Sequence, residues 1–230
     1  MKESLQAIWN GFDLTYILGI LSGLVSALLC ICLHELSHGV VAYKLGDDTA
    51  RQRGRLTLNP LKHLDLMGLF MMLAFRVGWA KPVPVNPNYF KNPKRGMALV
   101  ALAGPLVNVL LSAVFLFLYG LLFYLLSDST AGDYILSFLY VTATMSLGLA
   151  VFNLLPVPPL DGSKVLFSII PDSWYYKLLR YERYGSIAIF VLAFSGILSK
   201  PLSFMIDTVF SLLFPIAQLG FDLVIKIFVM

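Results

Sequence analysis

The stretch Leu14-Thr-Tyr-Ile-Leu-Gly-Ile-Leu-Ser-Gly-Leu-Val-Ser-Ala-Leu-Leu-Cys-Ile-Cys-Leu33-His34-Glu-Leu-Ser-His38 combines an apolar run with a cluster of ionisable residues. Its first 20 residues carry no charge, which is long enough for a helix to cross the hydrocarbon core of a bilayer. Ionisable groups are costly in a membrane, so those that follow such a run directly are functional by default. The stretch predicts a membrane-spanning helix with a functional site at its carboxyl end.

The rest of the chain has the same character. Hydrophobic residues make up 58% of it and charged residues 13%, far outside the range of soluble proteins. Uncharged runs cover residues 96–127 and 134–160, and two shorter or interrupted apolar stretches cover Tyr184–Ser199 and Leu202–Ile225. We therefore expect an all-α polytopic membrane protein with about five spans in contact with the lipid bilayer. The first run leads straight into the ionisable cluster, so we expect a span rather than a signal peptide there.

The region between the first two spans is rich in Pro and Gly and too polar for another ordinary span. Leu66–Phe75 is uncharged over ten residues, a length typical of re-entrant or interfacial segments. Lys81-Pro-Val-Pro-Val85 alternates Pro with Val, and Pro is tolerated in a sheet only at an edge. These features predict a short re-entrant β-hairpin or an extended strand that dips toward the membrane, shielded by protein or lining a wet cavity.

The basic residues predict the orientation of the spans. Fifteen of the 17 Lys and Arg residues lie in Lys44–Arg95, in Lys164–Arg183 and at Lys226. Such residues concentrate in cytoplasmic loops close to the spans. Five spans with the amino terminus outside fit this distribution. We therefore expect the functional site at the cytoplasmic face of the cell membrane. The net charge of +4 then reflects orientation and lipid contact, and no nucleic-acid partner is expected.

His34-Glu35-Leu36-Ser37-His38 is an H-E-x-x-H motif. The four-residue spacing places both imidazoles on one helix face, close enough to share a tetrahedral Zn²⁺ ion, with Glu35 placed to act as general base on the attacking water. The motif therefore predicts a zinc hydrolase with one zinc ion per chain.

A catalytic zinc site needs a third protein ligand and one open position. His63 lies in a polar loop, whereas Asp161 ends the third long apolar run. The first and third spans are both predicted to run from outside to inside, so their ends meet at the same face. The prolines between Asn153 and Asp161 would let the chain bend there. We therefore predict Asp161 as the third ligand and His63 as an interfacial side chain.

Four sequence blocks resemble the site-2 protease family of intramembrane zinc proteases. In family order they are His34-Glu-Leu-Ser-His38-Gly39, Gly78-Trp-Ala-Lys-Pro-Val-Pro-Val-Asn-Pro87, Ala103-Gly-Pro-Leu-Val-Asn108 and Asn153 through Gly162. The resemblance implies that His34, His38 and Asp161 bind zinc, that Glu35 is the base, and that Asn153 helps to hold the substrate or the developing oxyanion. It also implies a three-helix catalytic core formed by the first three spans.

The chain as a whole is expected to be one integral-membrane protease domain, residues 1–230, with the catalytic core at about 14–162 and further helices at about 163–230. It looks like a compact family form without a PDZ or nucleotide-sensing domain. The expected activity is zinc-dependent cleavage of a transmembrane segment in a single-span membrane protein, near the cytoplasmic side. The oligomeric state is left open.

Two other functions fit the sequence less well. A non-catalytic membrane scaffold or transporter component would be expected to lose Glu35 or a ligand, and neither is lost. A diiron hydroxylase or desaturase needs many more than the three histidines present. Two residues near the motif have open roles. Cys30 is expected to pack in the core rather than touch the metal, and Asn108 either hydrogen-bonds into the site or joins helices.

Overall fold

The computed structural model describes residues 14–75, 80–171, 185, 188–189, 191–192 and 195–228. Four of its helices are long and apolar enough to cross a membrane: α2 (Leu14–Lys44), α5 (Pro93–Leu126), α6 (Thr130–Asn153) and α10 (Ser199–Phe228). The chain is therefore an all-helical, multi-pass membrane protein, as predicted. The predicted fourth span, Tyr184–Ser199, lies partly outside the described residues; of its described part, residues 195–198 form a turn and Ser199 begins α10.

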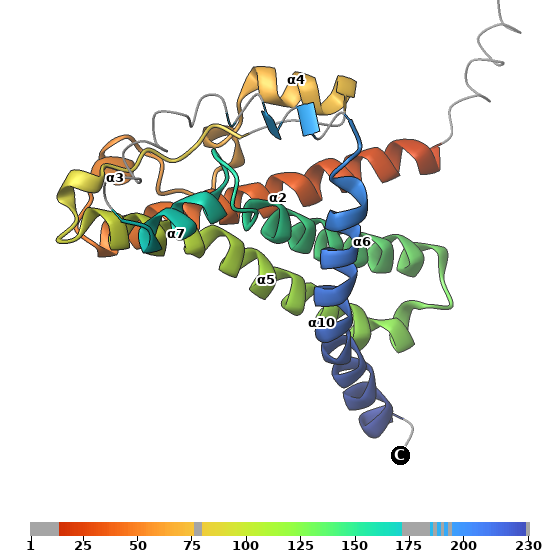
Figure 1. Cartoon of the computed structure of the whole chain (residues 1–230). Coiled ribbons are helices and arrows are strands. Elements are labelled where there is room, and N and C mark those ends of the chain that lie inside the picture. Colours follow the sequence, from red (N-terminus) through yellow and green to blue (C-terminus); the bar gives the residue numbers. More distant parts are fainter. Residues whose placement is uncertain are drawn as a thin grey trace, which may run out of the picture.

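Helices α2, α5 and α6 pack against one another and form the centre of the molecule (Figure 1). The short turn between α5 and α6 makes these two helices antiparallel, and α2 and α6 run toward the same end of the bundle. Ala101, Ala143 and Ala150 are almost fully buried in this core. No hydrophobic force drives helices together in lipid, so their association depends on close packing. Small residues such as these let the helix backbones approach closely.

Helix α10 crosses the bundle obliquely and packs on α5 and α6 (Figure 1). Its early part faces the second half of α6, where a Cβ on Gly148 would meet Ile206, and its late part reaches the end of α5, where Phe221 contacts Phe123. Helix α10 therefore runs away from the end at which α2 and α6 finish. Lys226, near the end of α10, therefore lies at the end of the bundle opposite the basic loops, and the prediction that it lies with them is wrong. The distribution of charges along the sequence does not determine in which direction a given helix runs.

The segment between α2 and α5 contains α3 (Thr49–Gln52), η1 (Pro60–Lys62), α4 (Leu66–Phe75) and η2 (Pro87–Tyr89). The predicted hairpin is replaced by a helix at α4, whose Leu, Met, Phe and Ala residues are mostly good helix formers without β-branching. Over the described parts of this segment, one isolated antiparallel bridge, between Leu64 and Ala80, is the sole strand-like pairing.

Residues 81–86 nevertheless run extended, as their prolines predict. A residue that precedes proline is restricted to the β and polyproline region, and this applies to Lys81 and Val83. The segment is anchored at its end by the buried side chain of Asp47, whose Oδ2 accepts a hydrogen bond from the backbone N–H of Asn86 at 2.6 Å. This contact ties the extended segment to the carboxyl end of α2.

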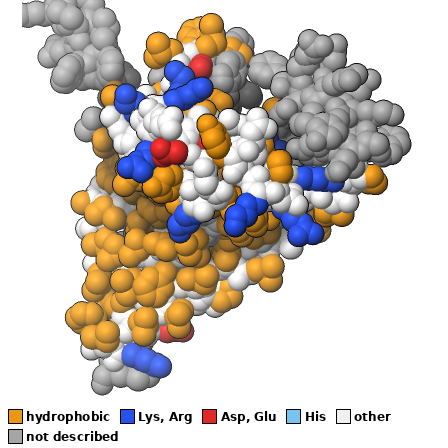
Figure 2. Space-filling view, turned by 90° about the vertical axis from the view of Figure 1, so that its left-hand side faces the viewer, with side chains coloured by type: hydrophobic (Ala, Val, Ile, Leu, Met, Phe, Trp, Pro, Cys, Tyr) orange, Lys and Arg blue, Asp and Glu red, His pale blue; other side chains and the backbone are white. Residues whose placement is uncertain are grey.

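The surface is divided by polarity. Figure 2 looks at the end of the bundle where α2 finishes and shows Lys and Arg side chains gathered around this end, above a large apolar face. Large apolar side chains such as Leu106, Leu110 and Leu212 are more than half exposed on the spans. An apolar surface of this extent on long helices is in contact with lipid.

Candidate metal centre and catalytic site

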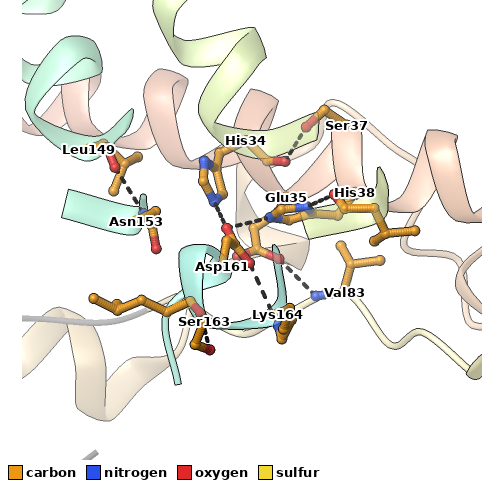
Figure 3. A network of polar contacts seen from close by, with 12 residues as sticks. His34, Glu35, Ser37, His38, Val83, Leu149, Asn153, Asp161, Ser163 and Lys164 are labelled. Atoms are coloured by element: carbon orange, nitrogen blue, oxygen red, sulfur yellow. Dashed lines mark hydrogen bonds and ion pairs between the residues drawn. The ribbon is translucent and has the colours of Figure 1, made fainter. Parts of the chain in front are cut away.

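The H-E-x-x-H motif occupies the later turns of α2. His34 and His38 are one turn apart, their ring centroids are separated by 4.6 Å, and both side chains are buried. Figure 3 shows the two imidazoles directed toward the start of α7 (Asp161–Ile169). The i, i+4 spacing has thus produced the shared face that the sequence predicted.

Asp161 meets both rings from the other side (Figure 3). It is the first residue of α7, and its Oδ2 atom lies 3.1 Å from His34 Nε2 and 3.2 Å from His38 Nε2. One ligand atom from each of the three residues lies within 4.8 Å of the others. Two imidazole nitrogens and one carboxylate oxygen are a ligand set of catalytic zinc sites. The predicted metal ligands are therefore brought together by α2 and α7.

Two contacts from α5 support the fit of a zinc ion. His38 Nδ1 lies 2.7 Å from the backbone carbonyl of Val100, so the ring donates there and leaves the lone pair of Nε2 for a metal. A Cβ on Gly104 would come within 2.6 Å of both imidazole rings. Only glycine at this position leaves the two histidines room to face Asp161.

The electrostatics of Asp161 also suit a metal ligand. Burial by itself raises the pKa of its carboxyl group, but hydrogen bonds from the Nε2 atoms of His34 and His38, whose place a bound metal ion would take, and the charges of His38 and Lys164 outweigh burial and hold the pKa well below its usual range. The ammonium group of Lys164 lies 3.6 Å from the outer oxygen, Oδ1. The carboxyl group is therefore ionised, which is the form that binds a metal.

Glu35 and Asn153 line the same cavity as the three predicted metal ligands. The cavity measures about 500 Å³, and its walls include His34, Glu35, His38, Asn153, Asp161 and Lys164. Glu35 Oε2 accepts a hydrogen bond of 2.9 Å from the backbone N–H of Val83 in the extended segment. Asn153 ends α6 and donates from Nδ2 to the carbonyl of Leu149 at 3.0 Å.

Two other sequence candidates lie outside this cluster. His63 is buried, and its Nε2 lies 2.9 Å from the carbonyl of Thr57. That it lies at the membrane interface stays a prediction. Cys30 is buried one turn before His34, and its thiol donates to the carbonyl of Thr142. Neither belongs to the metal-ligating group found among the described residues.

Three supporting features are not predictable from side-chain patterns: the missing side chain at Gly104, the carbonyl of Val100 and the N–H of Val83. Backbone groups leave no trace in a side-chain pattern. Gly104 did carry a signal, because a glycine inside a helical pattern usually has a packing or functional reason, and Pro105 follows it in the same apolar run.

The fold and the site together define a class: a membrane-embedded metalloprotease with an H-E-x-x-H helix. The model of peptidase family M50 matches residues 122–198. Several relatives carry the name "Putative zinc metalloprotease". YwhC of Bacillus subtilis is 38% identical over 210 residues, 89% of each chain, and Rip2 of Mycolicibacterium smegmatis is 32% identical over 183 residues, 75% of this chain and 66% of its own.

A third relative, "Zinc metalloprotease MJ0392" of Methanocaldococcus jannaschii, is 28% identical over 146 residues, 64% of this chain and 33% of its own. No solved structure matches the chain significantly. The chain belongs to peptidase family M50, the family of the site-2 proteases, and is a zinc metalloprotease.

Proposed function

We propose that this enzyme is an intramembrane endopeptidase that cleaves a transmembrane segment of a single-span membrane protein near the cytoplasmic side of the cell membrane. One observation carries the proposal: His34, His38 and Asp161 converge on one point of a cavity that Glu35 also lines, at the ends of apolar helices. In a soluble protease such a site would stand in a polar cleft. Here the substrate backbone would reach it from the membrane.

In the proposed reaction, His34, His38 and Asp161 hold the zinc ion, which when bound acidifies water and polarises the scissile carbonyl. Glu35 takes the proton of the attacking water and passes it to the leaving amine. The N–H of Val83 holds the Glu35 carboxylate in place before attack. Asn153 leaves the Leu149 carbonyl and donates its amide N–H to the developing oxyanion.

A helical substrate must unwind before it can react, because a transmembrane helix hides its peptide bonds in internal hydrogen bonds. The extended segment 81–86 lies beside Glu35 and is suited to receive the unwound stretch by strand addition. Pro82 and Pro84 have no N–H, so at these two residues the segment can only accept hydrogen bonds from the substrate backbone. Backbone pairing of this kind tolerates many substrate side chains.

The cytoplasmic orientation is supported by charge. The stretch Lys44–Arg95, between the ends of α2 and α5 nearest the site, carries ten of the 17 basic residues. The turn between α5 and α6 at the opposite end carries Asp128 and no basic residue. By the positive-inside rule the site end faces the cytoplasm.

The test compares wild type with Glu35→Gln in detergent. The substrate is a tagged full-length single-span protein, identified as one that accumulates in cells carrying Glu35→Gln. Wild type should cleave it, lose activity with a chelator and regain it with zinc, whereas Glu35→Gln should be slower by at least about 100-fold while still binding zinc. Equal cleavage by the two proteins, or no cleavage by zinc-loaded wild type, would refute the proposal and favour a scaffold.

A further inference from the structure

Below the metal ligands, the three-helix core carries polar side chains in two layers. One layer lies one turn from His34 and the other lies a further turn away along each helix. The layers consist, in turn, of Cys30, Asn108 and Ser146, and of Ser26, Ser112 and Thr142. All six side chains are at most 2% exposed. Polar groups at this depth are costly unless they are hydrogen-bonded.

Direct hydrogen bonds satisfy part of this column. Ser26 Oγ and Thr142 Oγ1 are 2.7 Å apart, and Ser146 Oγ donates to the backbone carbonyl of Asn108 at 2.8 Å. Within the described part of this core, the amide Oδ1 and Nδ2 of Asn108, the Oγ of Ser112 and the Nδ1 of His34 are buried without a hydrogen-bond partner. Three side chains of the core thus carry unsatisfied groups, and Asn108 is the one that lies a single turn from His34, a predicted zinc ligand.

The packing places these two groups near each other. A Cβ on Gly104 would lie 2.5 Å from His34 Cε1, so Gly104 and His34 are at the same level of the bundle. Asn108 follows Gly104 by one turn on α5, which runs away from the site, and therefore lies one turn below His34. Ser146 on α6 donates to Asn108, and Cys30, one turn before His34 on α2, donates to the carbonyl of Thr142, one turn before Ser146. These two contacts also place Asn108 about one turn below His34.

The chemistry of a zinc-bound imidazole says what His34 needs. A histidine that binds a metal through one nitrogen almost always donates the N–H of the other to a carbonyl, carboxylate or water, which fixes its tautomer and orientation. His38 has the carbonyl of Val100 for this purpose. His34 has no such direct partner in the described residues.

We propose that Asn108 is a positioning residue of the zinc site, which accepts the Nδ1–H of His34 through one buried water molecule. Buried water typically joins two to four otherwise unsatisfied polar groups, and the Nδ1 of His34 and the two amide atoms of Asn108 are such groups. The Asn108 amide thereby leaves the lone pair of His34 Nε2 directed at the metal. The inference rests on the proposed role of His34 as a zinc ligand.

The test uses the pair Asn108→Ala and Asn108→Ser in the full-length protein. Both variants keep the backbone carbonyl that Ser146 uses, but only serine keeps a polar group beside the water. Asn108→Ala should lower zinc affinity by about 10–100-fold, measured by competition with a chelator. It should also shift the visible absorption of the Co²⁺-loaded protein. Asn108→Ser should retain most of the affinity and the wild-type spectrum.

Ser112→Ala serves as the matched control, because it removes a buried hydroxyl one turn deeper on the same helix. It should leave zinc affinity unchanged. Wild-type zinc affinity and Co²⁺ spectrum in Asn108→Ala would overturn the proposal, and so would equal losses in the alanine and serine variants or in Ser112→Ala. Zinc binding is measured without a substrate, so failure here is distinguishable from failure of the proposed peptidase function.

Discussion

Gly104 is the residue on which the geometry of the metal site depends most directly. It belongs to α5, and a side chain there would occupy the space of the His34 and His38 rings. The rings could escape only by turning away from Asp161, because protein interiors are too tightly packed to absorb such an overlap without strain. A residue with no functional group thus decides whether three ligands can meet.

We expect Gly104→Ala to abolish high-affinity zinc binding and hence cleavage. The added methyl group would displace both imidazoles from a shared metal position. Zinc content of the purified protein measures the effect. Gly23→Ala is the matched control, since a Cβ on Gly23 meets nothing within 4 Å. Stoichiometric zinc in Gly104→Ala would contradict this account.

Val83 contributes through its backbone. Its N–H donates to Glu35 Oε2, and its place before Pro84 already restricts it to the β and polyproline region. Val83→Pro therefore removes the donor and should keep the chain extended. A hydrogen bond to a charged group contributes about 1.5–3 kcal/mol, so a fall in kcat of roughly tenfold or more is expected, with zinc affinity unchanged.

Steady-state kinetics and zinc titration on the same preparation measure this prediction. Val83→Ile, which keeps the N–H, should behave as wild type. A Val83→Pro enzyme with normal kcat would show that the contact to Glu35 has no part in positioning the base.

At the level of helices, α10 is joined to α5 by glycines. A Cβ on Gly120 would run into the backbone carbonyl of Ala217, and one on Gly220 would lie 2.5 Å from the carbonyl of Phe117. The two backbones are therefore in direct contact, as small residues allow where helices associate in lipid. Next to this contact the rings of Phe123 and Phe221 pack together, with their centroids 6.1 Å apart.

Gly120→Ala should therefore loosen α10 from the bundle and destabilise the protein by about 1–3 kcal/mol, the usual cost of overpacking. Thermal unfolding in detergent measures the effect as a lower midpoint temperature. Gly148→Ala is the control, because a Cβ there would make ordinary contact with Ile206 at 3.8 Å. An unchanged midpoint in Gly120→Ala would mean that α5 and α10 are not in such close contact.

For the molecule as a whole, the direction of α10 changes which end of the bundle carries Lys200 and Lys226, but it leaves the argument for the membrane orientation intact. With α10 running away from the site, Lys200 lies at the site end and Lys226 at the opposite end. One lysine simply exchanges sides with the other, so the excess of basic residues at the site end is the same. The positive-inside rule therefore favours the same cytoplasmic face with either direction of α10.

Cysteine labelling in intact cells tests this orientation. A membrane-impermeant maleimide should label Asp128→Cys and Lys226→Cys from outside, and Arg51→Cys only after the cells are permeabilised, because the first two lie at the end opposite the site. The native Cys30 and Cys32 are buried and should give little background. Labelling of Lys226→Cys together with Arg51→Cys would show instead that α10 ends at the site face.

The features that were predictable from the sequence are those set by nearby residues. Uncharged runs predicted the spans that became α2, α5 and α6, because crossing a bilayer is a matter of length and polarity. The spacing of His34 and His38 predicted their common face, because one helical turn separates them. The family resemblance supported Asp161 as the third ligand and Glu35 and Asn153 as catalytic residues, whose roles stay predictions.

Tertiary structure decided what depends on residues far apart in the chain. The approach of Asp161 to His34 spans 127 positions, and Gly104, Val100 and Val83 act on the site from other segments. Helix α4 in place of a hairpin and the direction of α10 are of the same kind. No local pattern encodes them, since each results from which surfaces pack together, and packing is settled only when the helices assemble.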